Sequence, residues 1–582
     1  MDLLQIKDFS VDFIADENTV RAVDNISFDV KRGQTVAVVG ESGSGKSVTA
    51  LSILKLLPQS TARYRSGEIL FTDGENHVID LLKQNDREMQ KIRGNRIAMI
   101  FQEPMTSLNP VFTCGNQLVE TIQRHKKIGR DEANEQAVRL FEKVKLPDPE
   151  NIFHRYPHQL SGGQRQRVMI AIAMSCSPSL LICDEPTTAL DVTVQKTILQ
   201  LIKELQEAEN MGVIFITHDL GVVAEIADHV VVLYKGKLVE KGNVGKIFYH
   251  PLHPYTKGLL NCRPALHQKG ERLPVVSDFL ESAKEKERTA DENGSSISKQ
   301  ESAVDRGAAM SQRPSLTDDL LIKVEHLNVW YTSSKTLWGK TTGYVKAVDG
   351  VSFEVYRGET LGLVGESGCG KTTLGRALLR LVEPQSGKII FNGMDLLSCS
   401  RGELKKLRKD IQIVFQDPYS SLNPRITIGD AIREPMTVHR LVEPEWQRNR
   451  KVEDLLEKVQ LNKEYVKRYP HEFSGGQRQR VVIARALALN PSFVVFDESV
   501  SALDVSVQAQ VLNLINDLKS ELGFTVIFIS HDLSVVHYIS DRILVMNQGR
   551  IEEMGSAEDV FHRPQKEYTR KLINSIPKGR IQ

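Results

Sequence analysis

Two glycine-rich stretches, one in each half of the chain, have the residue types and spacing that hold phosphate groups. Both follow the pattern G-x-x-x-x-G-K-[ST], in which glycines let successive backbone N–H groups converge on phosphate oxygens. The helix expected after each stretch points its positive end at the same anion. Lys46 and Lys371 would reach the β- and γ-phosphates of a nucleotide, and the hydroxyls of Ser47 and Thr372 would ligate Mg²⁺. The predicted nucleotide-binding loops are Gly40, Glu41, Ser42, Gly43, Ser44, Gly45, Lys46 and Ser47, and Gly365, Glu366, Ser367, Gly368, Cys369, Gly370, Lys371 and Thr372.

An apolar run ends in an Asp-Glu pair in each half, and a histidine follows both pairs at the same spacing. The aspartate can hold magnesium, and the glutamate is placed to polarise an attacking water. Such a general base contributes about 10²–10⁴-fold in rate. Alone, each acidic pair could equally end a strand at a solvated turn. The candidates are Asp184, Glu185 and His218, and Asp497, Glu498 and His531.

A second anion-binding element, Ser-Gly-Gly-Gln at the start of a predicted helix, occurs in both halves. A glutamine precedes it in each copy, after an apolar run, and completes the predicted magnesium sites: Gln102 with Ser47 and Asp184, and Gln416 with Thr372 and Asp497. The Ser-Gly-Gly-Gln residues are Ser161, Gly162, Gly163 and Gln164, and Ser474, Gly475, Gly476 and Gln477. An internal repeat of this kind predicts two similar domains.

The elements that must position these residues indicate an α/β fold in each repeat. Thr35–Val39 and Thr360–Val364 are short apolar runs that lead into the glycine-rich loops, and apolar periodicity predicts helices after them. Continuous apolar runs such as Leu180–Cys183 are typical of central parallel strands. We expect helical subdomains at about 116–154 and 428–468, inserted into each core sheet.

Composition excludes several classes of protein. The 582 residues are too many for one core, and 41% hydrophobic with 26% charged residues is ordinary for a soluble globular protein. The net charge of +1 does not suggest nucleic acid as a partner. No apolar run is long enough to span a membrane, and the N-terminus lacks the features of a signal peptide. Six scattered cysteines argue against a disulfide framework or a zinc site.

Residues 263–318 have a charged and then small, polar composition, which predicts a flexible linker with a short helix near 279–288. A regulatory or partner-binding segment is the alternative. The expected domains are 1–262, the linker 263–318, and 319–582. The first copy is longer between its lysine and Gln102, which predicts a longer surface hairpin at about 63–86.

The repeated motifs resemble those of ATP-binding cassette (ABC) ATPases, with two nucleotide-binding domains fused in one chain. The resemblance implies two P-loop ATPase domains, each with a core sheet and a helical subdomain, that hydrolyse ATP with Mg²⁺. In this family the Ser-Gly-Gly-Gln signature of one domain closes over the ATP of the other. Carried over, Ser474–Gln477 would cap the first site and Ser161–Gln164 the second, with Asp191 and Asp504 between them. Phe13 and Tyr331 match the aromatic residue that stacks on adenine, although both could be ordinary strand residues.

Further strings resemble the peptide importer group of this family, which serves di- and oligopeptides, nickel and glutathione. Among them are Arg-Tyr-Pro-His before each signature and the His-Pro-Tyr tail at 253–255; the second tail keeps only part of that pattern. Among fused members, the string Asp497–Asp504 fits the glutathione-import subtype. The resemblance implies an ATPase on the cytoplasmic face of the plasma membrane, docked through Gln102 and Gln416 on two integral-membrane permeases and supplied by an extracytoplasmic binding protein.

Other assignments stay open at this point. The cargo could be glutathione, short peptides or nickel. A fused ABC ATPase acting on ribosomes would also need no membrane segment, but it would not explain the His-Pro-Tyr tail. A DNA-repair ATPase would need a long coiled coil or zinc-binding cysteines. Cys369 replaces a serine-type residue in the second loop, and its side chain is expected to point away from phosphate.

Overall fold

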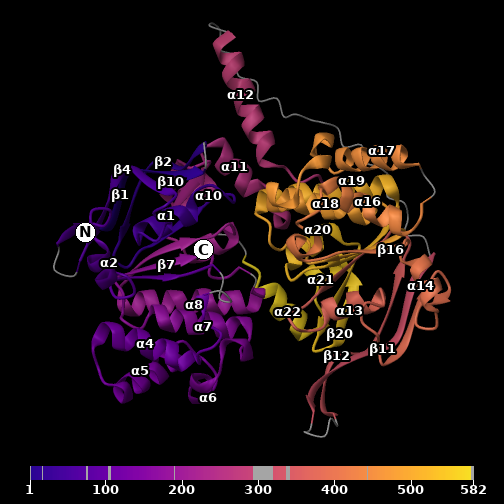
Figure 1. Cartoon of the computed structure of the whole chain (residues 1–582), viewed down its shortest axis with the longest axis horizontal. Coiled ribbons are helices and arrows are strands. Elements are labelled where there is room, and N and C mark those ends of the chain that lie inside the picture. The colour runs from indigo at the N-terminus through magenta and orange to yellow at the C-terminus, as the bar shows by residue number, and fades with distance from the viewer. Residues whose placement is uncertain are drawn as a thin grey trace. The chain divides into compact units, whose positions relative to one another are not determined.

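The apolar runs predicted as central strands lie in the middle of a six-stranded sheet in each half of the computed structural model (Figure 1). The strand orders are β10-β9-β3-β8-β7-β6 and β16-β17-β18-β13-β19-β20. Neighbours are parallel except at the edge pairs β9–β10 and β19–β20. The structure describes residues 2–15, 18–73, 77–102, 107–188, 190–292, 319–335, 341–441 and 444–577.

The strands of these two mixed sheets occupy corresponding positions in the repeats. In the first they are β3 (Thr35–Val39), β6 (Ile97–Ile100), β7 (Leu180–Asp184), β8 (Gly212–Ile216), β9 (His229–Tyr234) and β10 (Lys237–Asn243). In the second they are β13 (Thr360–Val364), β16 (Ile411–Val414), β17 (Phe493–Asp497), β18 (Thr525–Ile529), β19 (Arg542–Asn547) and β20 (Arg550–Ser556). The fold class predicted from sequence is confirmed.

A four-stranded antiparallel sheet accompanies each mixed sheet, in the orders β2-β1-β4-β5 and β12-β11-β14-β15. Its strands are β1 (Asp2–Ala15), β2 (Asn18–Lys31), β4 (Ala62–Thr72) and β5 (Val78–Asp80), and β11 (Leu320–Lys335), β12 (Thr341–Tyr356), β14 (Ser386–Phe391) and β15 (Met394–Asp395). The extra length predicted in the first copy is found here, because β4 has 11 residues and β14 has six. Residues 74–76 of that hairpin lie outside the described residues.

Alternation along a central strand explains its continuous apolar run. Successive side chains of a strand point to opposite faces of the sheet. Leu180 and Ile182 pack in the core shared with the antiparallel sheet and with α1 (Lys46–Ile53). Leu181 and Cys183 pack in the core on the other face, which is built from helices. Both faces of β7 are therefore buried, as expected of a central parallel strand.

The predicted helical subdomains are present in both halves. In the first, α4 and α5 contact each other and α7, and Figure 1 shows this group in purple beside α8. The first-unit helices are α1, α2 (Asp86–Ile92), α4 (Cys114–Lys126), α5 (Arg130–Lys143), α6 (Pro149–His154), η1 (Pro157–Gln159), α7 (Gly162–Ala173), α8 (Val192–Glu209), α9 (Leu220–Ile226), α10 (Val244–Tyr249) and α11 (Pro254–Asn261).

The second unit repeats the pattern after two elements of its own. These are η2 (Pro264–Leu266) and α12 (Val276–Glu292), which is longer than the short helix predicted there. The others are α13 (Lys371–Leu378), α14 (Arg401–Leu407), α15 (Pro418–Ser421), α16 (Ile428–Val438), α17 (Glu445–Lys458), η3 (Lys463–Lys467), η4 (Pro470–Glu472), α18 (Gly475–Leu487), α19 (Val505–Leu522), α20 (Leu533–Ile539), α21 (Ala557–His562) and α22 (Glu567–Asn574).

The helices after the glycine-rich loops are shorter than their apolar periodicity predicted. The apolar spacing continues to Leu57 and Leu381, but α1 ends at Ile53 and α13 at Leu378. Lys55 and Arg380 follow with φ of 49° and 48°, in the left-handed region, which an α-helix cannot continue through.

The segment predicted as a linker starts with residues that belong to the second unit. The described chain forms one unit up to Asn261, together with Pro577, and another from Cys262 to Ile576. Leu273 is buried, and Asn513 of α19 binds it twice: Nδ2 donates to the Leu273 carbonyl at 2.8 Å, and Oδ1 accepts from its N–H at 3.0 Å. The Tyr538 hydroxyl donates to the Glu271 carbonyl at 2.6 Å. Residues 293–318 of the predicted linker lie outside the described residues.

Among the described residues, no helix combines the length and the apolar character needed to cross a membrane.

Candidate functional site

The first glycine-rich loop is closed around its own lysine. Lys46 is 6% exposed, and its ammonium donates to the carbonyl oxygens of Gly40 at 2.7 Å and Glu41 at 2.9 Å. Gly45 has φ of 99°, and a Cβ there would lie 2.7 Å from the Ala22 carbonyl oxygen, so only glycine fits. A Cβ at Gly43 would meet nothing within 4 Å, so the backbone is open on that side. The loop is therefore curved around the lysine, and its backbone at Gly43 is left uncovered.

The second loop has the same form. Lys371 donates to the carbonyl oxygens of Gly365 at 2.7 Å and Glu366 at 3.0 Å. Cys369 is 5% exposed and packs in the hydrophobic core, and its sulfur lies 3.9 Å from the Lys371 ammonium. The side chain is thus turned into the protein, and the substitution of a serine-type residue leaves the loop's shape unchanged.

A hydroxyl and a carboxylate meet behind each loop. Ser47 Oγ donates to Asp184 Oδ1 at 3.0 Å, and Thr372 Oγ1 donates to Asp497 Oδ1 at the same distance. Neighbouring oxygen ligands around Mg²⁺, each 2.0–2.1 Å from the ion in octahedral geometry, are about 2.9 Å apart. The two oxygen pairs therefore have the chemistry and the spacing of adjacent magnesium ligands.

The glutamate after each strand has an unusual backbone. Glu185 and Glu498 both have φ of 47°, in the left-handed region, where a non-glycine residue is strained by about 1–3 kcal/mol. The N–H of Glu185 still bonds the Ile216 carbonyl at 3.0 Å, and that of Glu498 bonds Ile529 at 2.9 Å. The strand thus ends at the glutamate, whose side chain turns toward the glutamine and histidine of the same repeat.

Three side chains hold the Glu185 carboxylate. Gln102 Nε2 donates to Oε2 at 3.1 Å, and the Thr188 hydroxyl donates to the same oxygen at 3.0 Å. His218 Nδ1 lies 3.3 Å from Oε1. The predicted glutamate, glutamine and histidine are therefore brought together, and Thr188 is an addition that no spacing in the sequence indicated. The Gln102 amide nitrogen thus faces the carboxylate of Glu185.

The second carboxylate has the same glutamine and histidine but lacks the hydroxyl. Gln416 Nε2 donates to Glu498 Oε2 at 2.9 Å, and His531 Nδ1 lies 3.5 Å from the same oxygen. Ser501 takes the place of Thr188, and its buried hydroxyl makes no hydrogen bond within the described residues. The two carboxylates are therefore held by different sets of groups.

Adjacent carboxylates in each site have opposite electrostatic environments. Burial raises the pKa of Asp184 to about 6, against the hydrogen bond from Ser47. Burial also opposes ionisation of Glu185, but the His218 ring, Thr188 and the Lys46 ammonium outweigh it and lower the pKa of Glu185 to about 2.

The second site follows the same pattern. Burial raises the pKa of Asp497. Burial is again the largest single influence on Glu498, but the His531 ring and Lys371 together lower the pKa of that carboxyl. The glutamates are set to stay ionised, while the buried aspartates favour a cation.

The signature serines cap helices. Ser161 accepts from the Gln164 N–H at 3.3 Å, and Gln164 Oε1 accepts from the Ser161 N–H at 3.0 Å. Ser474 and Gln477 repeat this pair at 3.4 and 3.1 Å. Position 163 also requires a glycine for a steric reason, because a Cβ there would lie 2.6 Å from Val194 of α8. Asp191 and Asp504 begin α8 and α19 as N-cap residues.

The two predicted aromatic residues occupy matching places on the antiparallel sheets. Phe13 pairs with Val20, two residues before Ala22, whose carbonyl abuts the first loop at Gly45. Tyr331 pairs with Val345, two residues before Ala347, which abuts the second loop at Gly370 in the same way. Tyr331 is 44% exposed, whereas Phe13 packs partly against the core.

In each unit, the tail that follows the last strand is hydrogen-bonded to the glycine-rich loop. Sequence reasoning did not predict this contact. The Tyr255 hydroxyl, on the fully buried side chain of the His-Pro-Tyr motif, accepts from the Glu41 N–H at 2.9 Å. The Tyr568 hydroxyl accepts from the Glu366 N–H at 3.1 Å. The motif itself was the signal, but the contact joins residues more than 200 positions apart, and no local pattern reveals that.

A glutamate carboxylate from the last strand of each unit holds the start of the tail. The two oxygens of Glu240 accept from the N–H groups of Leu252 at 2.8 Å and His253 at 3.0 Å. Glu553 does the same for the N–H groups at 565 and 566, at 2.8 and 3.1 Å. The second tail thus keeps the structure of the first even where its sequence departs from His-Pro-Tyr.

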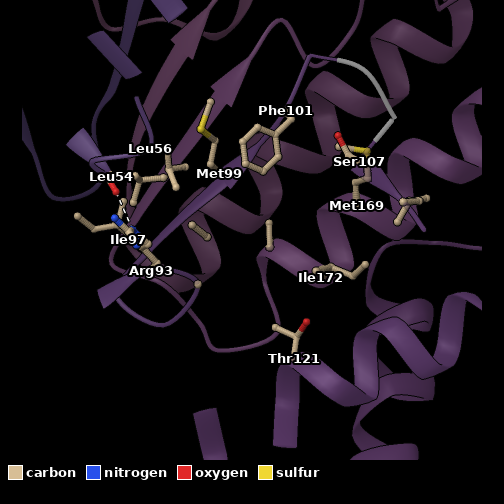
Figure 2. Close-up of a pocket in the computed structure, with 14 residues that line it drawn as sticks. Leu54, Leu56, Arg93, Ile97, Met99, Phe101, Ser107, Thr121, Met169 and Ile172 are labelled. Atoms are coloured by element: carbon tan, nitrogen blue, oxygen red, sulfur yellow. Dashed lines mark hydrogen bonds between the residues drawn. The ribbon is translucent and has the colours of Figure 1, made fainter. Parts of the chain in front are cut away.

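An apolar cavity of about 280 Å³ opens beside Gln102 in the first unit. Figure 2 shows Phe101, Met99, Met169 and Ile172 around it, with Thr121 at one end. Phe101 is 40% exposed. Arg93 closes one side by donating to the carbonyl oxygens of residues 54 and 55 at 2.7 and 2.9 Å. Residues 103–106, which follow Gln102, lie outside the described residues.

Comparison with known proteins decides the family. The model of the ABC transporter family matches residues 23–188 and 348–501, together more than half of the chain. The chain belongs to the ABC transporter family. A second model, the C-terminal region of oligopeptide/dipeptide transporters, matches residues 239–288 and 553–581. Both tails of this ABC protein are therefore of the same kind, and the predicted importer resemblance is confirmed.

Curated relatives match nearly the whole chain. The glutathione import ATP-binding protein GsiA of Salmonella choleraesuis (strain SC-B67) is 50% identical over 581 residues, which is 99% of this chain and 90% of the relative. The protein of the same name from Escherichia coli (strain K12) is 50% identical over 580 residues, 99% of this chain and 89% of the relative.

The tail tyrosines give a first prediction. The double variant Tyr255→Phe with Tyr568→Phe removes both hydroxyls that accept from the loops. Because a hydrogen bond contributes a net 0.5–1.5 kcal/mol, we expect ATP affinity to fall about 2–10-fold. Fluorescent-nucleotide titration measures this, with Tyr249→Phe, an exposed tyrosine of the first tail, as the control. Unchanged affinity in the double variant would show that the tail does not support the loops.

Proposed function

We propose that this ABC protein is the ATP-hydrolysing subunit of a membrane importer for glutathione or short peptides. The observation that carries the proposal is the bond between each importer-type tail and its phosphate loop, at Tyr255 and Tyr568. It ties the segment typical of oligopeptide and dipeptide transporters directly to the nucleotide site. The names of the relatives in Salmonella and Escherichia favour glutathione as the cargo.

The residues of each site have separate roles in this proposal. Lys46 and Lys371 neutralise the β- and γ-phosphates of ATP, and the loop N–H groups orient them. Phe13 and Tyr331 contact the adenine. Glu185 and Glu498 accept a proton from the attacking water, with His218 and His531 holding each carboxylate in place.

Magnesium fits the same sites. Ser47 with Asp184, and Thr372 with Asp497, would hold the ion through oxygen atoms already 3.0 Å apart, and Gln102 and Gln416 would complete its surroundings. When bound, Mg²⁺ neutralises charge that develops on the transferred phosphoryl group. The two raised aspartate pKa values are those of buried carboxylates that a cation would stabilise.

The proposed cycle is an ATP switch. Each of the two units is one cassette of the switch. Signature residues 161–164 of the first cassette close over the nucleotide of the second, and residues 474–477 of the second close over that of the first. Closure pulls on two permeases at the cytoplasmic face of the membrane, and hydrolysis resets the pair. An extracytoplasmic binding protein delivers the cargo.

Replacing both bases tests the chemistry. Glu185→Gln with Glu498→Gln keeps shape and hydrogen bonding but cannot accept a proton. We expect ATP binding to persist and the steady-state rate of ATP hydrolysis to fall about 10²–10⁴-fold. Glu204→Gln, an exposed glutamate of α8, is the control. Normal hydrolysis and transport by the double variant would remove these glutamates from the mechanism.

The pKa of Asp184 predicts a pH dependence. A protonated carboxyl cannot ligate Mg²⁺, so the Mg²⁺ needed for half-maximal ATP binding should rise as pH falls below about 6. Glu185, with a pKa of about 2, stays ionised throughout and does not cause the change. The measurement compares the chain with the variant Asp184→Asn plus Asp497→Asn, which retains only the pH dependence of the nucleotide. Identical pH profiles would contradict the assignment.

The cavity beside Gln102 is the proposed docking place for a cytoplasmic helix of one permease. An amphipathic helix can lay its apolar face into such a groove. The second cassette has Arg485 where the first has Ile172, and Arg485 is tied to Glu434 at 2.8 Å and to the Ser421 carbonyl at 2.7 Å. The two cassettes would therefore receive chemically different permease segments.

Affinity capture from detergent-solubilised cells tests this part. The tagged chain should bring down two multi-span permeases, and Ile172→Arg, which copies the second cassette, should lose one of them while ATP binding is retained. Recovery of both permeases by the variant would contradict docking in the cavity. Recovery of ribosomal proteins without permeases by the unaltered chain would overturn the transport function itself.

A further inference from the structure

Two histidines and a glutamate meet on the second cassette, away from the residues assigned to ATP. His537 lies on α20, and Glu558 and His562 lie four residues apart on α21. His537 Nε2 is 3.3 Å from Glu558 Oε2, and His562 Nε2 is 3.5 Å from Glu558 Oε1. One ligand atom from each residue lies within 4.8 Å of the other two.

These distances match a coordination geometry. Ligands 2.0–2.2 Å from a tetrahedral zinc ion are about 3.3–3.6 Å from one another. Each histidine nitrogen lies at such a distance from one of the two Glu558 oxygens, and two imidazoles with one carboxylate are a ligand set that suits borderline divalent metals. A fourth position would remain for water, because Glu558 and His562 are exposed.

The half-buried His537 is oriented by its neighbours before any ion arrives. Its ring stacks on Phe561, with centroids 4.2 Å apart and planes 22° apart, and meets His562 edge-on. The side chain of His537 is only 17% exposed, and burial lowers its pKa against the pull of Glu558, which favours the neutral ring that binds metal. The pair on α21 has the i, i+4 spacing that places two ligands on one helix face.

The first cassette shows that the fold does not require this cluster. The matching helices are α9 and α10, and the corresponding positions hold Ala224, Gly245 and Tyr249. None of these residues offers a strong metal ligand. The cluster is thus particular to the second cassette and has no part in the site that both share.

We propose that His537, Glu558 and His562 form a binding site for a divalent transition-metal ion such as Zn²⁺. The site joins α20, the helix that starts two residues after His531, to α21 in the tail. A bound ion would therefore fix the segment that follows His531 and would stabilise the second cassette by mass action. The scattered cysteines, which argued against a zinc site, do not bear on this set, because helix packing alone brings its members together.

Metal titration of the purified full chain tests the proposal. The metal-stripped protein is titrated with Zn²⁺ by calorimetry and with Co²⁺ by absorption, which reports tetrahedral geometry. The variant His562→Tyr installs the residue of the first cassette at an exposed position, so the fold is preserved. We expect the unaltered chain to bind one more equivalent of Zn²⁺ than the variant, or to bind that equivalent of Zn²⁺ at least about 10-fold more tightly.

Two further variants sharpen the result. Glu558→Gln should weaken the same equivalent, whereas His250→Tyr, which removes an exposed histidine from the first tail, should leave it intact. Equal zinc binding by the chain, His562→Tyr and Glu558→Gln would overturn the proposal, and so would the absence of any zinc binding by the unaltered chain.

Discussion

The structure of both sites depends on a buried ammonium group that is held by backbone carbonyls. Lys46 and Lys371 each bond two carbonyl oxygens of the loop that precedes them. A charge out of water must be hydrogen-bonded, and the loop therefore has to keep the curvature that brings those oxygens together. Glycines permit that curvature but do not enforce it. Tyr255 and Tyr568 supply part of the enforcement by accepting from the N–H of the loop's second residue.

The second constraint is that two carboxylates are adjacent in sequence but must behave differently. A strand directs neighbouring side chains to opposite faces, and the left-handed backbone at Glu185 changes that direction once more. Asp184 is left in a buried position beside a hydroxyl, whereas Glu185 reaches a histidine and an amide. Backbone strain of a few kcal/mol thus separates a group suited to a cation from a group that stays ionised beside it.

The sequence predicted those features of the fold and the sites that depend on a local pattern or on the internal repeat. The central strands followed from alternation between two buried faces, and Lys46 and Glu185 followed from motif spacing within the repeat. The end of α1 at Lys55 did not, because a left-handed backbone angle leaves apolar periodicity intact. Thr188 and Glu240 were missed for another reason: their roles arise from side chains packed together in three dimensions. Composition placed a break near residue 262, but it does not show that the segment after the break packs with the second unit.

The two repeats differ more at residues that take a less direct part in phosphate chemistry. The loops, the hydroxyl–carboxylate pairs and the tail anchors are alike to within a few tenths of an ångström, because each handles the same phosphate chemistry. Differences begin where a residue only supports that chemistry, as with Thr188 and Ser501. They are larger at the apolar cavity of the first cassette, where Ile172 corresponds to Arg485 in the second. In the proposed importer, a fused chain would let each copy meet a different permease segment, whereas binding the same nucleotide requires the two interiors to stay alike.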